Sequence, residues 1–294
     1  MTIRTHGGGA MPSPKTVRTS LGPVECIDHG EGPAILALHG GMGGCDQSWL
    51  LARALLPDIG SHRVVAVSRP GYLGTPLALA ETAEEQADLL AALLDTLGIR
   101  DAAVAAVSAG GPPALHFAVR HPGRCRGLVL VSAASGRMEV SAERFRRMRT
   151  MALLARIPGV TALLRRKLAA DPGKARARSI PDAGLRARTF ADPDAGPLLA
   201  AVQESILDGL NRRMPGTLND TRRLDTLPVP PLAAVRAPVL AVHAMDDDVV
   251  AIAHAEAVAA GVPGARLMRI DGGGHFCLFT HMHAVRDAAA AYLR

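Results

Sequence analysis

The stretch AAVAAVSAGGPPALHFAVRH, residues 102–121, joins two kinds of secondary structure at one sharp turn. Residues 102–107 form an apolar run typical of a buried strand, and residues 113–121 have a helical pattern. Small residues surround Ser108 at the junction, at positions 106 and 109–111. A strand that turns directly into a helix leaves no room for bulky neighbours and holds its central side chain in a strained, exposed position. The stretch therefore predicts an exposed serine between a strand and a helix.

Short apolar runs alternate with helical patterns on both sides of this turn, which is typical of a mostly parallel α/β sheet. We predict eight strands, at residues 16–20, 24–28, 34–38, 63–68, 102–107, 127–131, 239–243 and 266–270. Helices are predicted at residues 47–56, 83–97, 113–121, 252–260 and 284–293. Gly22 and Pro23 join the first two strands into a predicted hairpin, which gives the sheet an antiparallel edge.

The alternation stops between residues 136 and 231, where amphipathic helical patterns are separated by Pro and Gly. The clearest helix follows Asp194, which is placed to cap its first turn. Its buried stripe repeats every four residues and consists of Leu198, Val202, Ile206 and Leu210. We predict a flexible tail at residues 1–14, a core at residues 15–135 and 232–294, and a helical cap inserted at residues 136–231.

Composition and charge fit one large globular domain of 294 residues, 48% apolar and 20% charged. The formal net charge of +6 is local, because residues 137–225 carry +8 and the rest of the chain carries −2. Solvated helix faces explain this basic segment most simply, with recognition of an acidic substrate as the alternative. Only eight residues are aromatic, too few for stacking platforms, so we predict no nucleic-acid partner.

Cysteine spacing and apolar patterns bear on the compartment. The four cysteines are scattered without metal-ligand spacing, which fits a reducing compartment. The first fifteen residues contain no apolar stretch of the kind found in secretory signals, and residues 110–113 interrupt the one uncharged run long enough to span a membrane. We therefore expect a cytoplasmic protein with no membrane partner, no metal and no cofactor. The oligomeric state stays open.

A second junction between a strand and a helix carries HGGMGG at residues 39–44. Its glycines allow backbone amides to point into a cavity, which is what an enzyme needs when negative charge develops on a carbonyl oxygen. Neither a Lys-Ser/Thr pair nor a GxGxxG frame is present, which disfavours a nucleotide site. A purely structural turn is the alternative.

Two polar clusters follow predicted strands near the carboxyl end. The acids Asp246, Asp247 and Asp248 come after one strand, and GGGHF, with His275, comes after the next. Ser108, an acid and His275 then lie beyond the carboxyl ends of strands, where open α/β sheets bind ligands. A serine hydroxyl becomes a good nucleophile when an imidazole removes its proton, so this set indicates nucleophilic catalysis.

Taken together, the motifs resemble those of the α/β-hydrolase superfamily. HGGMGG is similar to its oxyanion loop, AVSAGG to its nucleophile elbow with Ala106 in place of the first glycine, HAMDDDVV to its acid turn, and GGGHF to its histidine loop. The resemblance implies a mostly parallel eight-stranded sheet flanked by helices, with an inserted helical cap. Ser68 stands where many members have Asp.

The resemblance also implies roles for single residues. Ser108 would be the nucleophile, His275 the general base and acid, and Asp247 the carboxylate that orients the imidazole, with Asp246 and Asp248 as alternatives to Asp247. The backbone amides of Gly41 and Ala109 would form the oxyanion hole. Candidate substrate-pocket residues are Met42, Cys45, Met148, Met151 and Phe276, with Leu153 and Leu154 as weaker candidates.

We expect a serine hydrolase that cleaves ester or lactone bonds of a small molecule through an acyl-enzyme. The first alternative is hydrolysis of a C–C bond in a dienoic diketone acid, in which a basic cap residue would hold the carboxylate. The second is an aminopeptidase-like amidase, because proline iminopeptidases are similar through HGG-x-G, although their caps supply carboxylates. The third is a hydrolase-fold receptor for a small molecule such as a lactone. A serine at the elbow excludes the alkyl-ester chemistry of the dehalogenases and epoxide hydrolases.

Overall fold

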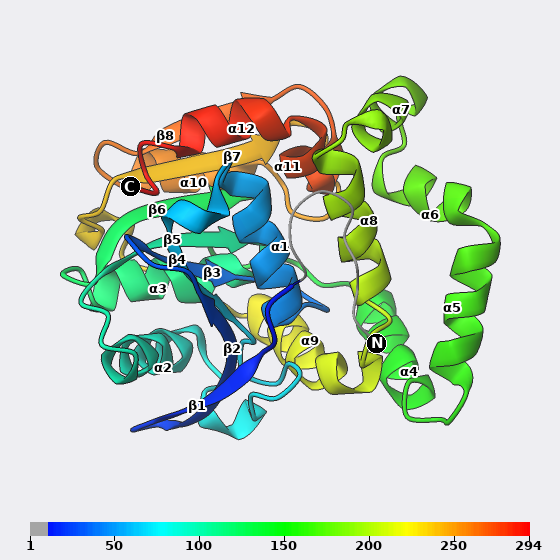
Figure 1. The fold of residues 1–294 in the computed structure, drawn as a ribbon, viewed down its shortest axis with the longest axis horizontal. Coiled ribbons are helices and arrows are strands. Elements are labelled where there is room, and N and C mark those ends of the chain that lie inside the picture. Colours follow the sequence, from blue (N-terminus) through cyan, green and yellow to red (C-terminus); the bar gives the residue numbers. More distant parts are fainter. Residues whose placement is uncertain (1–10) are drawn as a thin grey trace.

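A computed structural model describes residues 11–294 and contains one eight-stranded sheet (Figure 1). The strands are β1 (Lys15–Thr19), β2 (Gly22–His29), β3 (Ala34–Leu38), β4 (Arg63–Val67), β5 (Ala102–Val107), β6 (Cys125–Val131), β7 (Val239–Ala244) and β8 (Arg266–Ile270). Their order is β1-β2-β4-β3-β5-β6-β7-β8. The β1–β2 and β2–β4 pairs are antiparallel and the rest are parallel. The predicted sheet and its antiparallel edge are confirmed. Of the predicted tail, residues 1–10 lie outside the described part.

Helices cover both faces of this sheet (Figure 1). On one face lie α1 (Cys45–Leu55) and α12 (Met282–Ala289), and on the other lie α2 (Ala83–Thr96), α3 (Gly111–Arg120) and α10 (Ala253–Gly261). Side chains of β3 alternate between the two cores: Ile35 belongs to the α1 side and Leu36 to the α2 side. Because both faces are buried, the central strands are continuous apolar runs, as the sequence shows.

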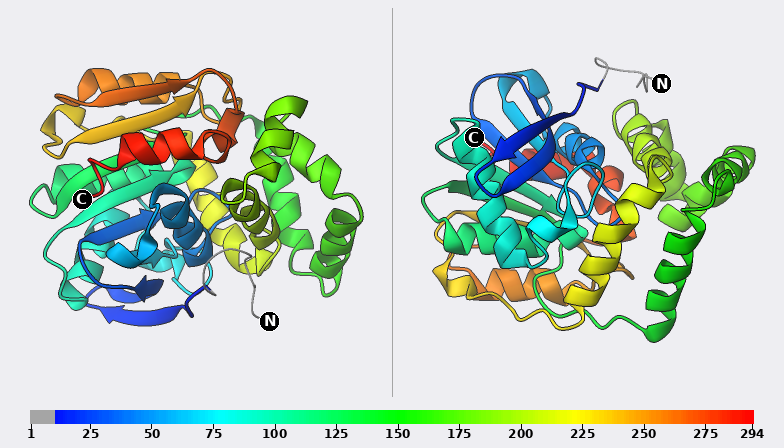
Figure 2. Two further views of the ribbon diagram at one scale, coloured as in Figure 1. Left: turned by 45° about the horizontal axis from the view of Figure 1, so that its top comes forward. Right: turned by 90° about the horizontal axis from the view of Figure 1, so that it is seen from below.

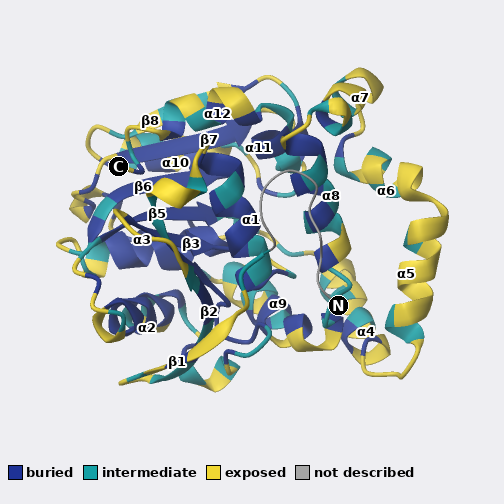
Figure 3. Cartoon of the chain, in the orientation of Figure 1, coloured by how far each residue is buried: buried dark blue, intermediate teal, exposed yellow. Residues whose placement is uncertain are grey.

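Six helices lie between β6 and β7 in the chain, within the predicted insertion. They are α4 (Ala142–Leu154), α5 (Val160–Ala170), α6 (Pro172–Ser179), α7 (Ala183–Ala191), α8 (Ala195–Ser205) and α9 (Leu210–Leu224). Helix α8 packs on α1, and Arg213 of α9 forms a buried two-point ion pair with Asp46 of α1. By contrast, α5 and α6 contain no buried residue and stand farthest from the sheet (Figures 2 and 3).

The buried stripe that the sequence predicts after Asp194 is divided between two helices. Helix α8 ends at Ser205, and Gly209, with a φ of 62°, precedes α9, which begins at Leu210. A left-handed residue interrupts a helix, and glycine adopts this conformation without steric cost. The four-residue period continues across the break, so periodicity alone could not reveal it.

The predicted helix cap at Asp194 is wrong. The Asp192 carboxylate accepts the hydrogen bonds from the backbone N–H groups of Asp194 and Ala195, at 2.9 and 2.8 Å. The carboxylate of Asp194 instead pairs with Arg286 of α12 at 2.9 Å. Asp192 and Asp194 both fit the sequence pattern of a helix cap. Only the fold shows that Asp194 is paired with Arg286 of α12 instead.

No helix among the described residues is both long and apolar enough to cross a membrane.

Candidate active site

Ser108 stands at the turn between β5 and α3 with a left-handed backbone, φ 55°. This conformation costs a non-glycine residue about 1–3 kcal/mol, so the surrounding packing must impose it. The two glycines that follow allow that packing. A Cβ on Gly110 would lie 2.7 Å from the carbonyl oxygen of His39, and one on Gly111 would lie 2.3 Å from that of Ala134. The small residues therefore hold the serine at the carboxyl edge of the sheet.

His275 and Asp247 are in direct contact at the same edge. The imidazole Nδ1 lies 2.9 Å from Oδ2 and 3.2 Å from Oδ1 of the carboxylate, which is fully buried. Oδ1 also accepts the backbone N–H groups of Val249 and Val250, each at 2.9 Å. Because an ionised carboxylate can only accept, Nδ1 of His275 carries the proton, and Nε2 is left free to accept one.

The environment of Asp247 keeps it ionised. Burial acts to raise its pKa, but hydrogen bonds from His243, His275 and the Val250 amide outweigh burial and hold the pKa well below its usual value. The Nε2 of His243 lies 2.8 Å from the Val250 carbonyl oxygen and 3.4 Å from Oδ2 of Asp247. Among the described residues, the buried Nδ1 of His243 has no hydrogen-bond partner. No role is predicted for His243 from the sequence, and in the fold its ring lies against the Asp247 carboxylate.

The three consecutive acids have different surroundings. Asp246 accepts the backbone N–H groups of Gly274 at 2.9 Å and Gly273 at 3.3 Å, and thereby anchors the loop that carries His275. Both glycines have positive φ, 110° at Gly273 and 56° at Gly274, which explains why glycines precede the histidine. Asp248 is exposed. Of the three acids, Asp247 is the one whose carboxylate contacts the imidazole.

His39 and Arg69 hold the glycine loop that follows β3. Nε2 of His39 accepts the backbone N–H of Arg69 at 3.0 Å, so Nδ1 carries the proton and donates to the carbonyl oxygen of Gly40 at 2.6 Å. Burial, reinforced by the charge of Arg69, keeps the pKa of His39 well below its usual value, and the ring stays neutral. The Arg69 guanidinium donates to the carbonyl oxygens of His39 and Gly40, at 3.0 and 3.3 Å.

Gly40 and Gly41 of this loop differ in what a side chain at their positions would contact. A Cβ on Gly40 would lie 2.8 Å from Cβ and 3.4 Å from Oγ of Ser108, so the loop can pass this close only without a side chain. A Cβ on Gly41 would meet no atom within 4 Å. A side chain at Gly41 would therefore point into open space, and Gly41 itself lines the cavity that Ser108 also lines.

Helix α9 of the insertion is bonded to this loop. Asp220 forms a two-point ion pair with the Arg69 guanidinium, Oδ2 to Nη2 at 2.6 Å and Oδ1 to Nη1 at 3.2 Å, and it accepts the Tyr72 hydroxyl at 2.5 Å. The backbone N–H of Met42 donates to Oγ1 of Thr217 at 3.0 Å. The glycine loop and α9 are therefore positioned by the same contacts.

A cavity of about 130 Å³ lies beside Ser108 and His275. It is lined by Gly40, Gly41, Gln47, Leu51, Val107, Ser108, Val202, Ile206, His275, Phe276, Leu278 and Phe279. This lining contains no Lys, Arg, Asp or Glu. In the part of the chain that the structure describes, no group of three or more His, Cys, Asp or Glu could hold a metal ion.

One of the predicted pocket residues, Phe276, lines this cavity and stands edge-on to His275. Met42, Met148 and Met151 do not line it. They pack against a small apolar cluster between α4 and α9 that includes Met214. Helical spacing predicts that these methionines make apolar contacts, but it does not predict which helix they pack against.

Cys45 is also absent from the cavity lining. It is buried against Glu25, with Sγ 3.9 Å from Oε2, and burial raises the pKa of its thiol to about 12. Ser68 donates to the same Oε2 at 2.8 Å and accepts the backbone N–H of Cys45 at 2.9 Å. Where many superfamily members have Asp, this chain combines a serine with a carboxylate from β2.

Helices α1 and α8 contribute side chains to the cavity that the sequence does not predict there. Gln47 and Leu51 come from α1, and Val202 and Ile206 come from α8 and its end. Nε2 of Gln47 donates to Oγ of Ser205 at 2.9 Å, which links the two helices beside the cavity. The four-residue stripe marked Val202 and Ile206 as buried, and only the fold shows that they face Ser108.

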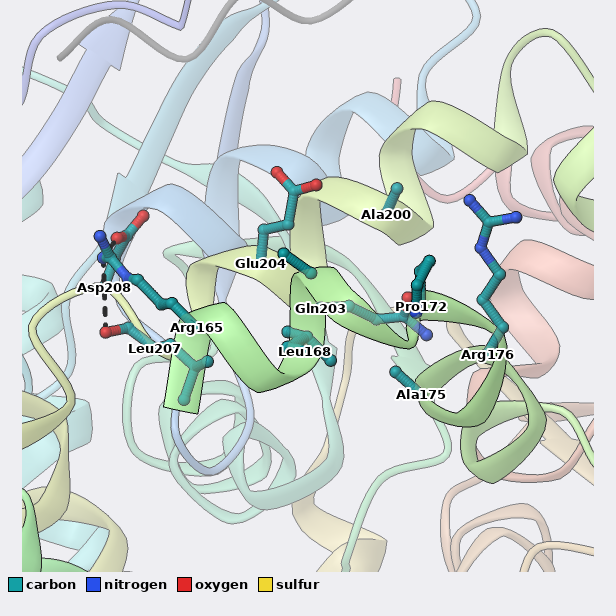
Figure 4. A pocket seen from close by; sticks show the side chains of 11 residues that line it. Arg165, Leu168, Pro172, Ala175, Arg176, Ala200, Gln203, Glu204, Leu207 and Asp208 are labelled. Atoms are coloured by element: carbon teal, nitrogen blue, oxygen red, sulfur yellow. Dashed lines mark hydrogen bonds and ion pairs between the residues drawn. The ribbon is translucent and has the colours of Figure 1, made fainter. Parts of the chain in front are cut away.

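A second hollow, a groove of about 590 Å³, lies on the other side of α8, between that helix and α5 and α6 (Figure 4). Gln203 and Leu207 line it, with Arg165 and Arg176 from the opposite helices. Neither Ser108, Asp247 nor His275 is part of its lining. Helix α8 therefore separates the cavity beside Ser108 from the larger groove.

The family described as alpha/beta hydrolase fold matches residues 33–282. The chain belongs to this family. The α/β-hydrolase is similar over almost its whole length to the solved alpha/beta hydrolase fold protein from Nakamurella multipartita, with 32% identity and a TM-score of 0.78. That alignment covers 96% of this chain and 99% of the other.

Other relatives of this α/β-hydrolase carry different activities in their names. It is 33% identical over 121 residues to the 2-hydroxymuconate semialdehyde hydrolase of Pseudomonas sp. (strain CF600), across 40% of this chain and 41% of the relative. In partial matches of this kind the chain spans about two fifths of the curated relative's length. An esterase from Thermogutta terrifontis shares the fold, with a TM-score of 0.68 and 22% identity over 96% of this chain and 98% of the esterase.

Proposed function

We propose that this α/β-hydrolase is a serine hydrolase that cleaves small, uncharged carboxylic esters or lactones through an acyl-enzyme. Ser108 is the nucleophile, His275 the base and acid, and Asp247 the group that orients His275. The amides of Gly41 and Ala109 bind the developing oxyanion. Helices α4–α9, within residues 136–231, act as a cap, and α8 supplies the wall opposite the serine.

The contact between Asp247 and His275, on a cavity that both His275 and Ser108 line, carries this proposal. Because its Nδ1–H donates a hydrogen bond to the Asp247 carboxylate, His275 can take the hydroxyl proton of Ser108 through Nε2 as the oxygen attacks the carbonyl carbon. The negative charge passes to the carbonyl oxygen, which the amides of Ala109, in the turn before α3, and of Gly41, in the glycine loop, would bind. His275 then gives its proton to the leaving alkoxide, and water repeats the sequence on the acyl-enzyme.

Cavity size and polarity favour a small neutral acyl group. A volume of about 130 Å³ is below the usual range for ligand pockets, and the lining is aliphatic and aromatic apart from Gln47, Ser108 and His275. A buried carboxylate or ammonium would need an opposite charge nearby, and the lining provides none. The amidase alternative, which needs carboxylates for a substrate amine, is disfavoured for the same reason.

C–C bond hydrolysis is the second candidate, because the relative from Pseudomonas sp. is named a hydrolase of 2-hydroxymuconate semialdehyde, an unsaturated oxo acid like the substrate of that alternative. An acidic substrate of this kind requires a cation close to the serine, and the lining of the cavity beside Ser108 contains no Lys or Arg. The ester or lactone assignment therefore remains our choice. Four free thiols among the described residues support the cytoplasmic location that we propose with it.

The test is labelling and turnover of the wild type and of the Ser108→Ala variant. A fluorophosphonate should label the wild type and leave Ser108→Ala unlabelled, while p-nitrophenyl acetate is turned over many times by the wild type only. Loss of Ser108 as part of a triad lowers kcat by about a millionfold. Single-turnover hydrolysis would favour the receptor alternative. Faster cleavage of a dienoic diketone acid than of any ester would favour C–C bond hydrolysis. Full activity of Ser108→Ala would exclude Ser108 as the nucleophile.

A further inference from the structure

Exposed large apolar side chains are concentrated at one corner of the insertion. Among the described residues, eight large hydrophobic side chains are exposed, and five of them fall within residues 153–164. They are Leu153 (63% exposed), Leu154 (45%), Ile157 (50%), Leu163 (54%) and Leu164 (37%). We call this set the apolar corner. These five residues lie at the end of α4, in the turn after it and at the start of α5.

The helices around the apolar corner carry the excess positive charge of the chain. Residues 142–178, which include α4, α5 and most of α6, contain eleven Lys or Arg and two acids, a net charge of +9. Arg147 and Arg165 are ion-paired, with Glu143 and Asp208. In the described part of the chain, the other nine cations of this segment form no ion pair with a carboxylate. The positive charge is therefore available to an external partner.

This segment projects from the rest of the molecule. Helices α5 and α6 contain no buried residue (Figure 3), and a groove of about 590 Å³ separates them from α8 (Figure 4). Within that groove the ion pair between Arg165 and Asp208 bridges the two sides. Figure 2 shows these helices at the edge of the molecule farthest from the sheet. Their exposed side chains can meet a flat surface without obstruction by the core.

We infer that residues 142–178 bind the surface of an anionic phospholipid bilayer, with the apolar corner inserted among the acyl chains. Leu and Ile side chains gain free energy when they leave water, and unpaired Arg and Lys beside them attract anionic headgroups. A helix with both features lies in the interface without spanning it, which agrees with the lack of a spanning helix among the described residues. The sequence predicts no membrane partner, whereas the exposure of these side chains in the fold favours one.

Charge and apolarity together favour a bilayer over other partners. A second copy of this chain would bring another +9 segment against the first, which repels it. Nucleic acid would attract the cations but would leave five exposed aliphatic side chains in water. A bilayer that contains anionic lipid complements both. This inference does not depend on the proposed reaction, since no residue of the apolar corner lines the cavity beside Ser108.

Vesicle sedimentation tests the inference with the full chain. We expect wild type to sediment with phosphatidylcholine vesicles that contain about one third phosphatidylglycerol, and to bind pure phosphatidylcholine at least about tenfold more weakly. High salt should weaken the first interaction, because it screens the headgroup charge. Equal binding to both vesicle types, or no binding to either, would overturn the inference.

Two pairs of variants separate the apolar from the electrostatic contribution. Leu153→Ser with Leu163→Ser should reduce binding by at least about tenfold, whereas the control pair Leu21→Ser with Val229→Ser, of similar exposure elsewhere, should not change it.

Arg166→Glu with Lys167→Glu should likewise abolish the preference for anionic vesicles, and Arg18→Glu with Arg266→Glu should preserve it. Circular dichroism confirms that each variant is folded. If a control variant loses vesicle binding as strongly as the variant it is matched with, the overall charge or hydrophobicity of the protein is the cause and the inference is wrong. Self-association that Leu153→Ser with Leu163→Ser abolishes, or salt-sensitive binding of duplex DNA without vesicle binding, assigns the surface to another partner.

Discussion

Arg69 and Asp220 form a two-point ion pair between the turn after β4 and helix α9, although 151 positions separate them in the chain. The guanidinium is 1% exposed, and it also donates to two carbonyl groups of the glycine loop beside Ser108. A buried guanidinium must be fully paired, so Arg69 makes the loop and the inserted helix depend on each other. At α9 the insertion is a fixed part of the site.

Asp220→Ala should lower both stability and activity, because it leaves a buried guanidinium without its carboxylate. We expect a loss of about 3–5 kcal/mol in the free energy of unfolding, measured by urea denaturation. The kcat for p-nitrophenyl acetate should fall as well, since Arg69 no longer holds the loop. Asp225→Ala, an exposed acid at the end of the same helix, is the control. Equal effects of the two changes would show that the ion pair does not position the loop.

Replacing each of the three consecutive acids by Asn should separate their roles. Asp247→Asn should lower kcat by about 10⁴, because an amide no longer fixes the proton on Nδ1 of His275. Asp246→Asn should cause a smaller fall, since it weakens two hydrogen bonds to the loop that carries His275. Asp248→Asn should have no effect on kcat. If the largest loss came from Asp248→Asn, the proposed acid would be the wrong one.

The stability that the Asp247 carboxylate contributes should depend on pH below about pH 5. Its pKa is about 3.9 in the unfolded chain and lies well below that value in the folded protein. A group with a lowered pKa stabilises the fold above its unfolded pKa, and this stabilisation is lost as the pH falls towards the folded pKa. The difference in unfolding free energy between wild type and Asp247→Asn should therefore shrink between about pH 5 and pH 2. A difference that grew with acidity would show that the pKa is raised.

Ile206→Ala should shift the preference towards longer acyl chains, because it enlarges the cavity beside Ser108. We expect the ratio of kcat/KM for p-nitrophenyl hexanoate over acetate to rise about tenfold. Leu207→Ala removes a similar volume from the groove on the other side of α8 and should leave the ratio unchanged. An equal shift in both variants would mean that α8 moves as a whole.

The predicted and the missed parts of the site differ in how far apart their residues lie in the chain. The elbow at Ser108 and the glycines before His275 can be predicted, because their geometry depends on neighbours within a few positions. The pairs Arg69–Asp220 and Arg213–Asp46 cannot be, because each joins the core to α9 across more than a hundred residues. Arg213 was one basic residue among many in the sequence, and in the fold it is 1% exposed.

The sheet was predicted almost strand by strand, because buried parallel strands are short apolar runs bounded by turns. The insertion was less predictable. Its helices have weakly apolar faces, and α5 and α6 bury no residue at all, so periodicity has little to mark. The exposure that makes α5 and α6 difficult to predict from the sequence is also the observation that supports binding to a membrane surface.

Helix α8 has a hollow on each side, with Val202 and Ile206 towards Ser108 and Gln203 and Leu207 towards the groove. Consecutive residues of an α-helix are rotated by about 100°, so deleting one residue at the start of α8 would turn Gln203 and Leu207 towards the serine. Such a deletion would change the walls of both hollows in a single step. A point substitution changes one wall, whereas a change in helix length would move all four side chains while leaving the sheet, Ser108, Asp247 and His275 untouched.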